Sequence, residues 1–366
     1  MNRETLLKLY DRLTRLIEKL PGGLQKPILR ELVPIREIFL EQRPPRLMLI
    51  GPSAISPIEF LTRLGALNVT LGEGDNGWRA VDTPQLGTVQ VLDARFEVPH
   101  AAVETALARL EPDLIVFLQD SIESVEVAEL EVAALRAGMC PSDVPIAGIS
   151  FAGDAGRSRL SALLHSSRDF SQRRQAVMSW DESQKSHVAE VLCGLLPNPA
   201  KLDFARATGA KEAQAAIAGS LLKSFTAVCG VIGLQPIPLA DMPVLTTLQT
   251  LMVGLIIHTT GRRIDMRLIT EFLGAMGLSV GAGMLFREGA RAIVKVVPIW
   301  GNAVSGLVAG AGTYAIGRSA VAYFIEDIPI TETRKLFRKL LPGWKTFKRK
   351  RVPQIEEAKP PALPEE

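Results

Sequence analysis

Residues Asp113–Gln119 read DLIVFLQ, a short apolar run that is typical of a strand buried on both faces. Helical patterns lie on both sides of it, Val98–Leu110 before the run and Ile122–Ala137 after it. A strand between two helices is the repeating unit of an α/β protein. The stretch therefore predicts a mainly parallel sheet whose strands are joined by right-handed helical crossovers.

The same alternation continues in both directions along the chain. Three more strand-like runs are RLMLIG at residues 46–51, VPIAGIS at 144–150 and QAVMSW at 175–180. A hairpin is predicted around Pro84–Gly87, between the segments WRAVDTP and GTVQVLDARF. Further helices are expected at about residues 156–165 and at 182–195, the second capped by Asp181. Together these elements predict a three-layer α/β domain.

The composition limits the class of protein. The chain has 366 residues, of which 47% are hydrophobic and 22% charged, enough for about two domains with cores of their own. A wholly disordered chain does not fit. The three cysteines lie far apart and have no zinc-ligand spacing, which favours the reducing interior of a cell. The charged, amphipathic first 20 residues predict no secretory leader.

Four segments are predicted from shifts in composition. They are residues 1–43, two amphipathic helices split by Pro21-Gly22-Gly23; 44–197, the α/β domain; 200–330, an all-α domain rich in Gly and Ala; and 331–366, a basic and then Pro/Glu-rich tail. In the all-α domain, Ala205–Gly233 is predicted to form one helix.

Two runs of the all-α domain lack formal charge, 20 residues at Met242–Gly261 and 22 at Val296–Gly317. Both reach the length of a membrane span of about 20 residues. Small residues also recur every four positions, as at Gly306 and Gly310, which allows close helix packing in lipid or in water. Membrane association, integral or peripheral, is favoured, and a soluble helical domain is the alternative.

A basic block follows the all-α domain. Residues 334–351, RKLFRKLLPGWKTFKRKR, hold nine basic side chains and no acidic one. The whole chain has a formal charge of +3, so the rest of the chain has a formal charge of −6. We expect such a block not to pack, and its interleaved aromatic residues suit an anionic membrane surface. The predicted contacts are Lys345, Lys348, Arg349, Lys350 and Arg351. A solvated tail is equally open, and no specific nucleic-acid site is predicted.

The loop after the first strand decides whether the α/β domain binds phosphate, because ligands bind beyond the carboxyl ends of parallel strands. A phosphate-binding loop reads Gly-x-x-x-x-Gly-Lys-Ser/Thr, where the lysine contacts the phosphates and the hydroxyl binds magnesium. With Gly51 in the first position, Ser56, Pro57 and Ile58 take the last three. Pro57 supplies neither a cation nor an N–H, and Ile58 cannot bind magnesium.

The order of elements and the place of this loop resemble an Era-like small GTPase domain, which implies a P-loop-NTPase-like fold. The resemblance places the family's Asp-x-x-Gly motif at Asp93-Ala94-Arg95-Phe96, where only the aspartate is kept. It places the guanine-reading Asn-Lys-x-Asp motif at Phe151-Ala152-Gly153-Asp154, where only Asp154 is kept. The guanine-contacting Ser-Ala loop corresponds to Ser179-Trp180.

The second half of the chain, from about Leu202 to Phe324, resembles the uncharacterised YcjF-like helical domain that follows Era-like GTPase domains. The stretches that carry this resemblance are PIPLADMPVLTTLQTLMV, GLSVGAGMLFREGARA, and the segment from VPIWGNAVSG to AGTYAIGRSAVAYF. The two resemblances together cover roughly Arg46 to Phe324.

The lost motif residues predict a pseudo-GTPase adaptor, with no catalytic residue, metal or cofactor. Each charge-assisted hydrogen bond forgone costs about 1.5–3 kcal/mol, so most nucleotide affinity should be absent. The expected partners are an anionic membrane at its cytoplasmic face and an unidentified protein, for example an intact GTPase relative in a homo- or hetero-oligomer. Two alternatives stay open: a weak GTPase that binds GTP and magnesium, and a soluble, cytoplasmic, oligomerising scaffold.

Overall fold

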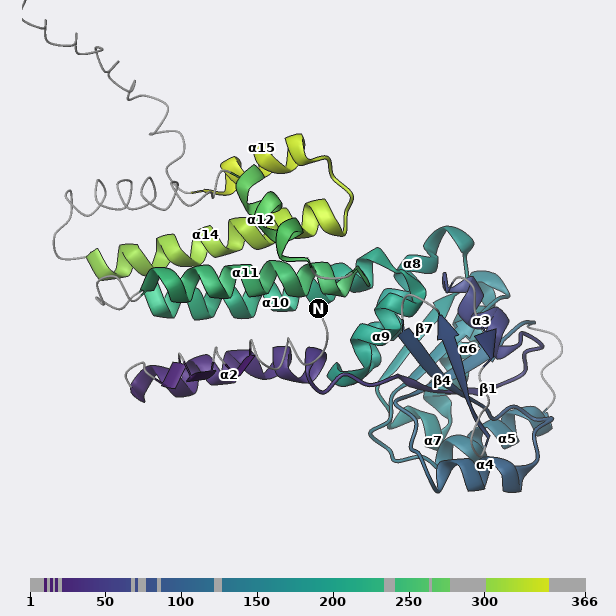
Figure 1. Ribbon diagram of the computed structural model, residues 1–366. Helices are drawn as coiled ribbons and strands as arrows, with labels where there is room; N and C mark the ends of the chain where they lie inside the picture. Colours follow the sequence, from purple (N-terminus) through teal and green to yellow (C-terminus); the bar gives the residue numbers. More distant parts are fainter. Residues whose placement is uncertain are drawn as a thin grey trace, which may run out of the picture.

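The computed structural model describes residues 10–11, 14–15, 17–18, 22–66, 70–71, 77–83, 87–121, 127–233, 241–262, 265–276 and 301–341. The protein is an α/β protein with a large helical portion, and its sheet lies at one end of the molecule beside a bundle of long helices (Figure 1).

The sheet has seven strands in the order β2-β3-β4-β1-β5-β6-β7. Their bounds are β1 Arg46–Ile50, β2 Thr70–Leu71, β3 Trp78–Thr83, β4 Gly87–Asp93, β5 Leu114–Gln119, β6 Ile146–Ser150 and β7 Gln175–Ser179. Strands β3 and β4 pair antiparallel, as expected for the two strands of the predicted hairpin, whose turn at residues 84–86 lies outside the described residues. Strand β2 also pairs antiparallel to β3. The pairs from β4 through β1, β5 and β6 to β7 are all parallel, as the apolar runs predicted.

Both faces of the sheet are buried, in two separate cores. Leu47 and Leu49 of β1 point into the first core, whereas Met48 and Ile50 point into the second, because side chains alternate along a strand. The helices of this part are α3 Pro57–Arg63, α4 His100–Leu107, α5 Val127–Gly138, α6 Gly153–Ser166, α7 Arg168–Ser171 and α8 Lys185–Leu195, with a 3-10 turn at Glu182–Gln184. Helices α3 and α8 contribute to the first core, and α4 to α7 contribute to the second.

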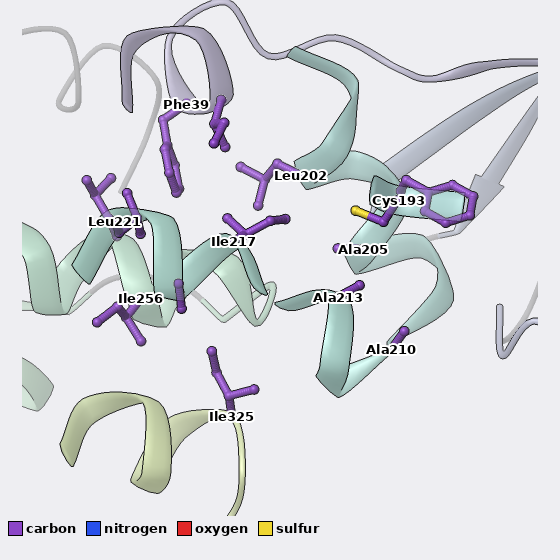
Figure 2. Close-up of a cluster of buried hydrophobic side chains, with 14 of the residues drawn as sticks. Phe39, Cys193, Leu202, Ala205, Ala210, Ala213, Ile217, Leu221, Ile256 and Ile325 are labelled. Atoms are coloured by element: carbon purple, nitrogen blue, oxygen red, sulfur yellow. The ribbon is translucent and has the colours of Figure 1, made fainter. Parts of the chain in front are cut away.

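The helical portion continues the first core. Its helices are α2 Gly22–Phe39, α9 Asn198–Thr208, α10 Lys211–Gly233, α11 Asp241–Thr259, α12 Met266–Ala275, α14 Gly301–Phe324 and α15 Ile330–Leu340. Figure 2 shows how side chains of α2, α9, α10 and α11 converge, for example Phe39, Leu202, Ile217 and Ile256. The sheet and the bundle therefore share one continuous apolar core.

The prediction of a single helix over Ala205–Gly233 is wrong. The segment contains the end of α9 and all of α10, because Gly209 adopts a left-handed conformation (φ +62°) and ends α9. The boundary predicted between residues 197 and 200 falls at the start of α9, which packs against both β4 and α2. In the N-terminal segment, Gly22 and Gly23 lie inside α2, whereas Pro21 is outside the described residues.

Small residues bring α10 and α14 close together. A Cβ atom added at Gly310 would lie 3.5 Å from the carbonyl oxygen of Thr226 and 3.6 Å from the Cα of Gly230. The predicted spacing of four thus places Gly306 and Gly310 against α10, since the carbonyl oxygen of Gly306 lies 3.7 Å from a Cβ at Gly230.

The expectation that the basic block cannot pack is wrong for its first part. Helix α15 packs on α14 and buries Phe337, while Arg334, Lys335, Arg338 and Lys339 remain exposed. A helix separates these residues onto two sides, so the cations stay in water while the apolar side chain is buried. The predicted membrane contacts at residues 345–351 lie outside the described residues.

Among the residues that the structure describes, α10 is the one helix that is long and apolar enough to cross a membrane. Half of the apolar stretch of α10 is buried inside the molecule, and the core helix of a soluble protein can have the same length and hydropathy. The predicted span at Met242–Gly261 corresponds to α11, and the predicted span at Val296–Gly317 corresponds to part of α14. Residues 296–300 lie outside the described residues.

Candidate functional site

The candidate site lies at the carboxyl edge of the sheet. Strands β1, β4, β5, β6 and β7 run parallel, so the loops that follow them meet at this edge. The site residues predicted from the sequence all belong to these loops or to the elements next to them; they are Gly51, Ser56, Pro57, Ile58, Asp93, Asp154 and Ser179. The structure brings them to one edge, and their contacts decide what this edge can bind.

Gly51 is required where β1 leaves the sheet. Its φ is +97°, which L residues rarely adopt, and a Cβ atom there would lie 2.5 Å from the carbonyl oxygen of Leu118. The same atom would lie 2.9 Å from the ring of Phe117. The loop therefore starts with its backbone pressed against β5.

The carboxylate of Asp120 fills the loop that Gly51 begins. Its Oδ1 accepts a hydrogen bond from the Ser53 hydroxyl at 2.6 Å, and its Oδ2 accepts one from the Ala54 N–H at 2.7 Å. The Ser53 hydroxyl oxygen also accepts a hydrogen bond from the Ile55 N–H at 3.2 Å, and the Asp120 N–H donates to the carbonyl oxygen of Pro52 at 3.3 Å. The carboxylate that follows β5 therefore accepts hydrogen bonds from the donors of the loop that follows β1.

Ser56, Pro57 and Ile58 have structural roles in the described chain. The Ser56 hydroxyl accepts from the Glu59 N–H at 3.1 Å and caps α3, whose first residue is Pro57. Ile58 lies in the first turn of α3, and its carbonyl accepts a hydrogen bond from the Thr62 hydroxyl. The hydroxyl that this segment does contain therefore caps a helix.

Asp93 is held by Arg95 in a two-pronged ion pair. The Nε and Nη2 groups of Arg95 donate to Oδ1 and Oδ2 of Asp93 at 2.8 and 2.7 Å. Burial alone would raise the pKa of Asp93, but the hydrogen bonds and charge of Arg95 outweigh it and lower that pKa. The Nη1 group of Arg95 also donates to the carbonyls of Ser53 and Ile55, at 2.6 and 2.8 Å. Arg95 therefore joins the loop after β4 to the loop after β1.

A second arginine fixes the loop after β4 from the other side. The buried guanidinium of Arg136, on α5, donates to the carbonyl oxygens of Ala94, Arg95 and Val98. Burial lowers the pKa of Arg136. Because one guanidinium binds three carbonyl groups within residues 94–98, it holds that loop in one conformation.

The far end of the edge is occupied by an aromatic pair. Phe151 and Trp180 have ring centroids 5.6 Å apart, and the guanidinium of Arg63 lies 5.2 Å from the centroid of Phe151. Next to them, the Ser179 hydroxyl donates to Asp154 at 3.3 Å, while the Asp154 side chain is 84% exposed and pairs with Arg157. The two predicted residues Asp154 and Ser179 are thus in contact with each other.

The described part of the chain contains no cluster of three or more His, Cys, Asp or Glu side chains that could hold a metal ion. A groove of about 620 Å³ lies elsewhere, between α2, α8 and α10, and its lining includes Ile38, Val191 and Ile217. The buried thiol of Cys193 also lines this groove, and burial raises its pKa to about 12, which favours the protonated thiol over the thiolate.

Sequence reasoning missed Asp120 and Arg136, and it did not predict that Arg95 binds both Asp93 and the loop after β1. Asp120 directly follows the buried strand β5, and an acidic residue at the carboxyl end of a parallel strand was the available signal. Comparison of the chain with protein-family models, with characterised proteins and with solved structures finds no match.

Proposed function

We propose that this protein is a pseudo-GTPase adaptor that does not hydrolyse nucleotide. In this proposal the sheet part is an Era-like, P-loop-NTPase-like domain, and the helices after it correspond to the YcjF-like domain. One observation carries the proposal: the donors of the loop after β1 are bound by the chain's own carboxylate, Asp120.

Electrostatics disfavour a phosphate in this loop. A phosphate near the Ala54 N–H would lie beside the Asp120 carboxylate, and two like unit charges about 4 Å apart repel by roughly 4 kcal/mol at an effective dielectric constant of 20. The cation that would offset this repulsion is lacking at Pro57. Arg95 contacts the carbonyl groups of Ser53 and Ile55 in this loop, but its charge is already paired with that of Asp93.

Magnesium would meet the same difficulty. Ile58 stands where the family has the metal-binding hydroxyl, and both carboxylate oxygens of Asp93 already accept hydrogen bonds from Arg95. Because phosphoryl transfer depends on a metal ion that bridges the phosphates, these contacts argue against hydrolysis.

The exposed cations of α15 and the basic residues after it support attachment to the cytoplasmic face of a membrane. Each basic residue near an anionic leaflet contributes about 1 kcal/mol of binding. The second candidate function is a soluble scaffold, and the half-buried state of α10 in the shared core favours it.

Calorimetric titration of the full chain with Mg–GTP tests the adaptor proposal. We expect no binding heat up to millimolar nucleotide, whereas binding in the micromolar range would defeat the proposal and favour a weak GTPase.

A second test concerns the membrane. Replacing Lys345, Lys348, Arg349, Lys350 and Arg351 by Gln should weaken binding to anionic vesicles, and unchanged, salt-insensitive binding would remove this segment from the proposal. Carbonate extraction then distinguishes integral from peripheral attachment.

A further inference from the structure

Helix α5 has an outer face that is both apolar and acidic. Val127, Glu131 and Leu135 are spaced by four residues, so they lie along one side of the helix. Val127 is 71% exposed and Leu135 is 56% exposed, although α5 buries Ala133 and Ala137 on its inner side. Large apolar side chains exposed in a row along a helix are unusual on a surface that faces only water.

The loop beside α5 extends this face. Arg136 of α5 binds three carbonyl groups of residues 94–98, which fixes the loop next to the helix. The loop presents Phe96, which is 49% exposed, and the exposed Glu97. We call these five residues, Phe96, Glu97, Val127, Glu131 and Leu135, the α5 face. An aromatic side chain on a loop held this firmly can be buried by a partner at little conformational cost.

The chain itself contains a segment of complementary chemistry. Residues 343–351, GWKTFKRKR, combine Trp344 and Phe347 with five cations and no acidic residue. Residues 44–197, which include the α5 face, carry 20 acidic and 12 basic side chains, a formal charge of −8. Aromatic side chains with flanking cations match apolar side chains with flanking carboxylates, which favours association.

A chain cannot reach its own α5 face with this segment. Helix α5 covers the second core, whereas α15 contributes Phe337 to the first core, on the other face of the sheet. In Figure 1, α15 lies on top of the helical bundle, and α5 lies at the bottom of the sheet part. Helices α14, α10 and α9 and then the sheet lie between them, at about 8–10 Å per packed layer. Trp344 is only three residues beyond Leu341, and three Cα–Cα steps span at most about 11 Å.

We infer that residues 343–351 of one copy dock on the α5 face of a second copy. Trp344 and Phe347 would cover Phe96, Val127 and Leu135, while the cations face Glu97 and Glu131. Because one surface meets a different surface, this contact is heterologous, so copies add head to tail. The basic segment then has two exclusive uses, since a segment docked on a second copy is not available to an anionic membrane.

Sedimentation velocity of the full chain is the first test. We expect association that grows with protein concentration at about 0.1 M salt and weakens at about 1 M, where charges are screened beyond about 3 Å. A chain that stays monomeric at every concentration overturns the inference.

A charge swap makes the test specific. Glu131→Lys should weaken association at least about tenfold, as should the double substitution Lys348→Glu with Arg349→Glu, and combining all three should restore part of it. Glu212→Lys, at an exposed position on α10, is the matched control and should leave association unchanged. An equal effect of the control, or no effect of Glu131→Lys, contradicts the inference.

Leu135→Ser separates docking from lipid binding, because the exposed leucine can be replaced without disturbing the core. We expect the association constant of this variant to fall at least about tenfold, and we expect the variant to bind anionic vesicles as well as the wild type does. Unchanged association in Leu135→Ser, together with vesicle binding that depends on residues 345–351, would assign the segment to lipid alone.

Discussion

The loop after β1 and the contact between α10 and α14 both leave little room for another molecule, because groups of the chain itself occupy them. The groups that do so are of opposite kinds. Charged side chains close the loop, where Asp120 and Arg95 occupy its donors and acceptors. The helix contact is closed by the lack of side chains, since Gly310 and Gly230 let two backbones meet. Removing one charge should therefore free the polar groups of the loop, whereas adding a side chain larger than a methyl group should separate the two helices.

The largest expected effect belongs to the helix contact. Gly310→Leu should lower the free energy of unfolding by about 3 kcal/mol, because the side chain must enter a space closed by the backbone of α10. Gly310→Ala should be neutral or stabilising by up to about 1 kcal/mol, since its Cβ meets ordinary contact distances and alanine favours the helix. Urea unfolding of both variants checks this pair, and equal losses for the two would show that packing at this contact is not the cause.

The same small substitution should act differently in the other region. Gly51→Ala should cost about 2 kcal/mol, because φ is positive there and the Cβ meets the backbone of Leu118 at 2.5 Å. Comparing its urea midpoint with that of Gly310→Ala separates the two regions directly. Equal stability of the two alanine variants would contradict the close approach of the loop to β5.

The ion pair of the loop should show itself through pH. Asp93→Asn should cost about 1.5 kcal/mol at pH 7, because it removes a half-buried charge pair. The folded pKa of Asp93 is lowered below the unfolded value of about 3.9, so this stability is complete above pH 3.9 and is lost as the pH falls through the folded pKa. The difference between wild type and variant should therefore shrink below pH 3.9, as measured by chemical unfolding at several pH values. A difference that is constant down to pH 2 would exclude the ion pair as its source.

The smallest effect concerns the carboxylate that fills the loop. Asp120→Ala should cost only about 1 kcal/mol, because the donors of Ser53 and Ala54 become accessible to water. Inorganic phosphate near its dissociation constant should then raise the melting temperature of the variant by about 1 °C and leave the wild type unchanged. Asp154→Ala is the matched control, since it removes an exposed carboxylate of the same edge that binds no loop N–H. A response of the control equal to that of Asp120→Ala would reject the proposed role of Asp120.

The sequence predicted β1, β5 and β6 well because they are continuous apolar runs and almost all of their residues are buried. The short strand β2 was not predicted, since two residues carry no periodic pattern. It missed the division between α9 and α10, since one glycine, Gly209, ends a helix inside an otherwise uniform helical pattern. It also misjudged residues 334–340, because counting charges ignores how a helix places Phe337 inside and the cations outside.

The contacts that define the candidate site could not be predicted in the same way. Asp120 and Ser53 are 67 residues apart, and Arg136 and Ala94 are 42 apart. Local periodicity carries no information on such pairs, which form only when parallel strands bring their loops to one edge. The sequence could show that a lysine and a hydroxyl were replaced, but not which groups bind the loop in their place.

Crystals of the full chain soaked with Mg–GTP test the central claim most directly. The account predicts no nucleotide beside Gly51 and an unbroken contact between Asp120 and the donors of Ser53 and Ala54. A guanine nucleotide bound at that loop with its magnesium ion, and with Asp120 displaced, would contradict the account.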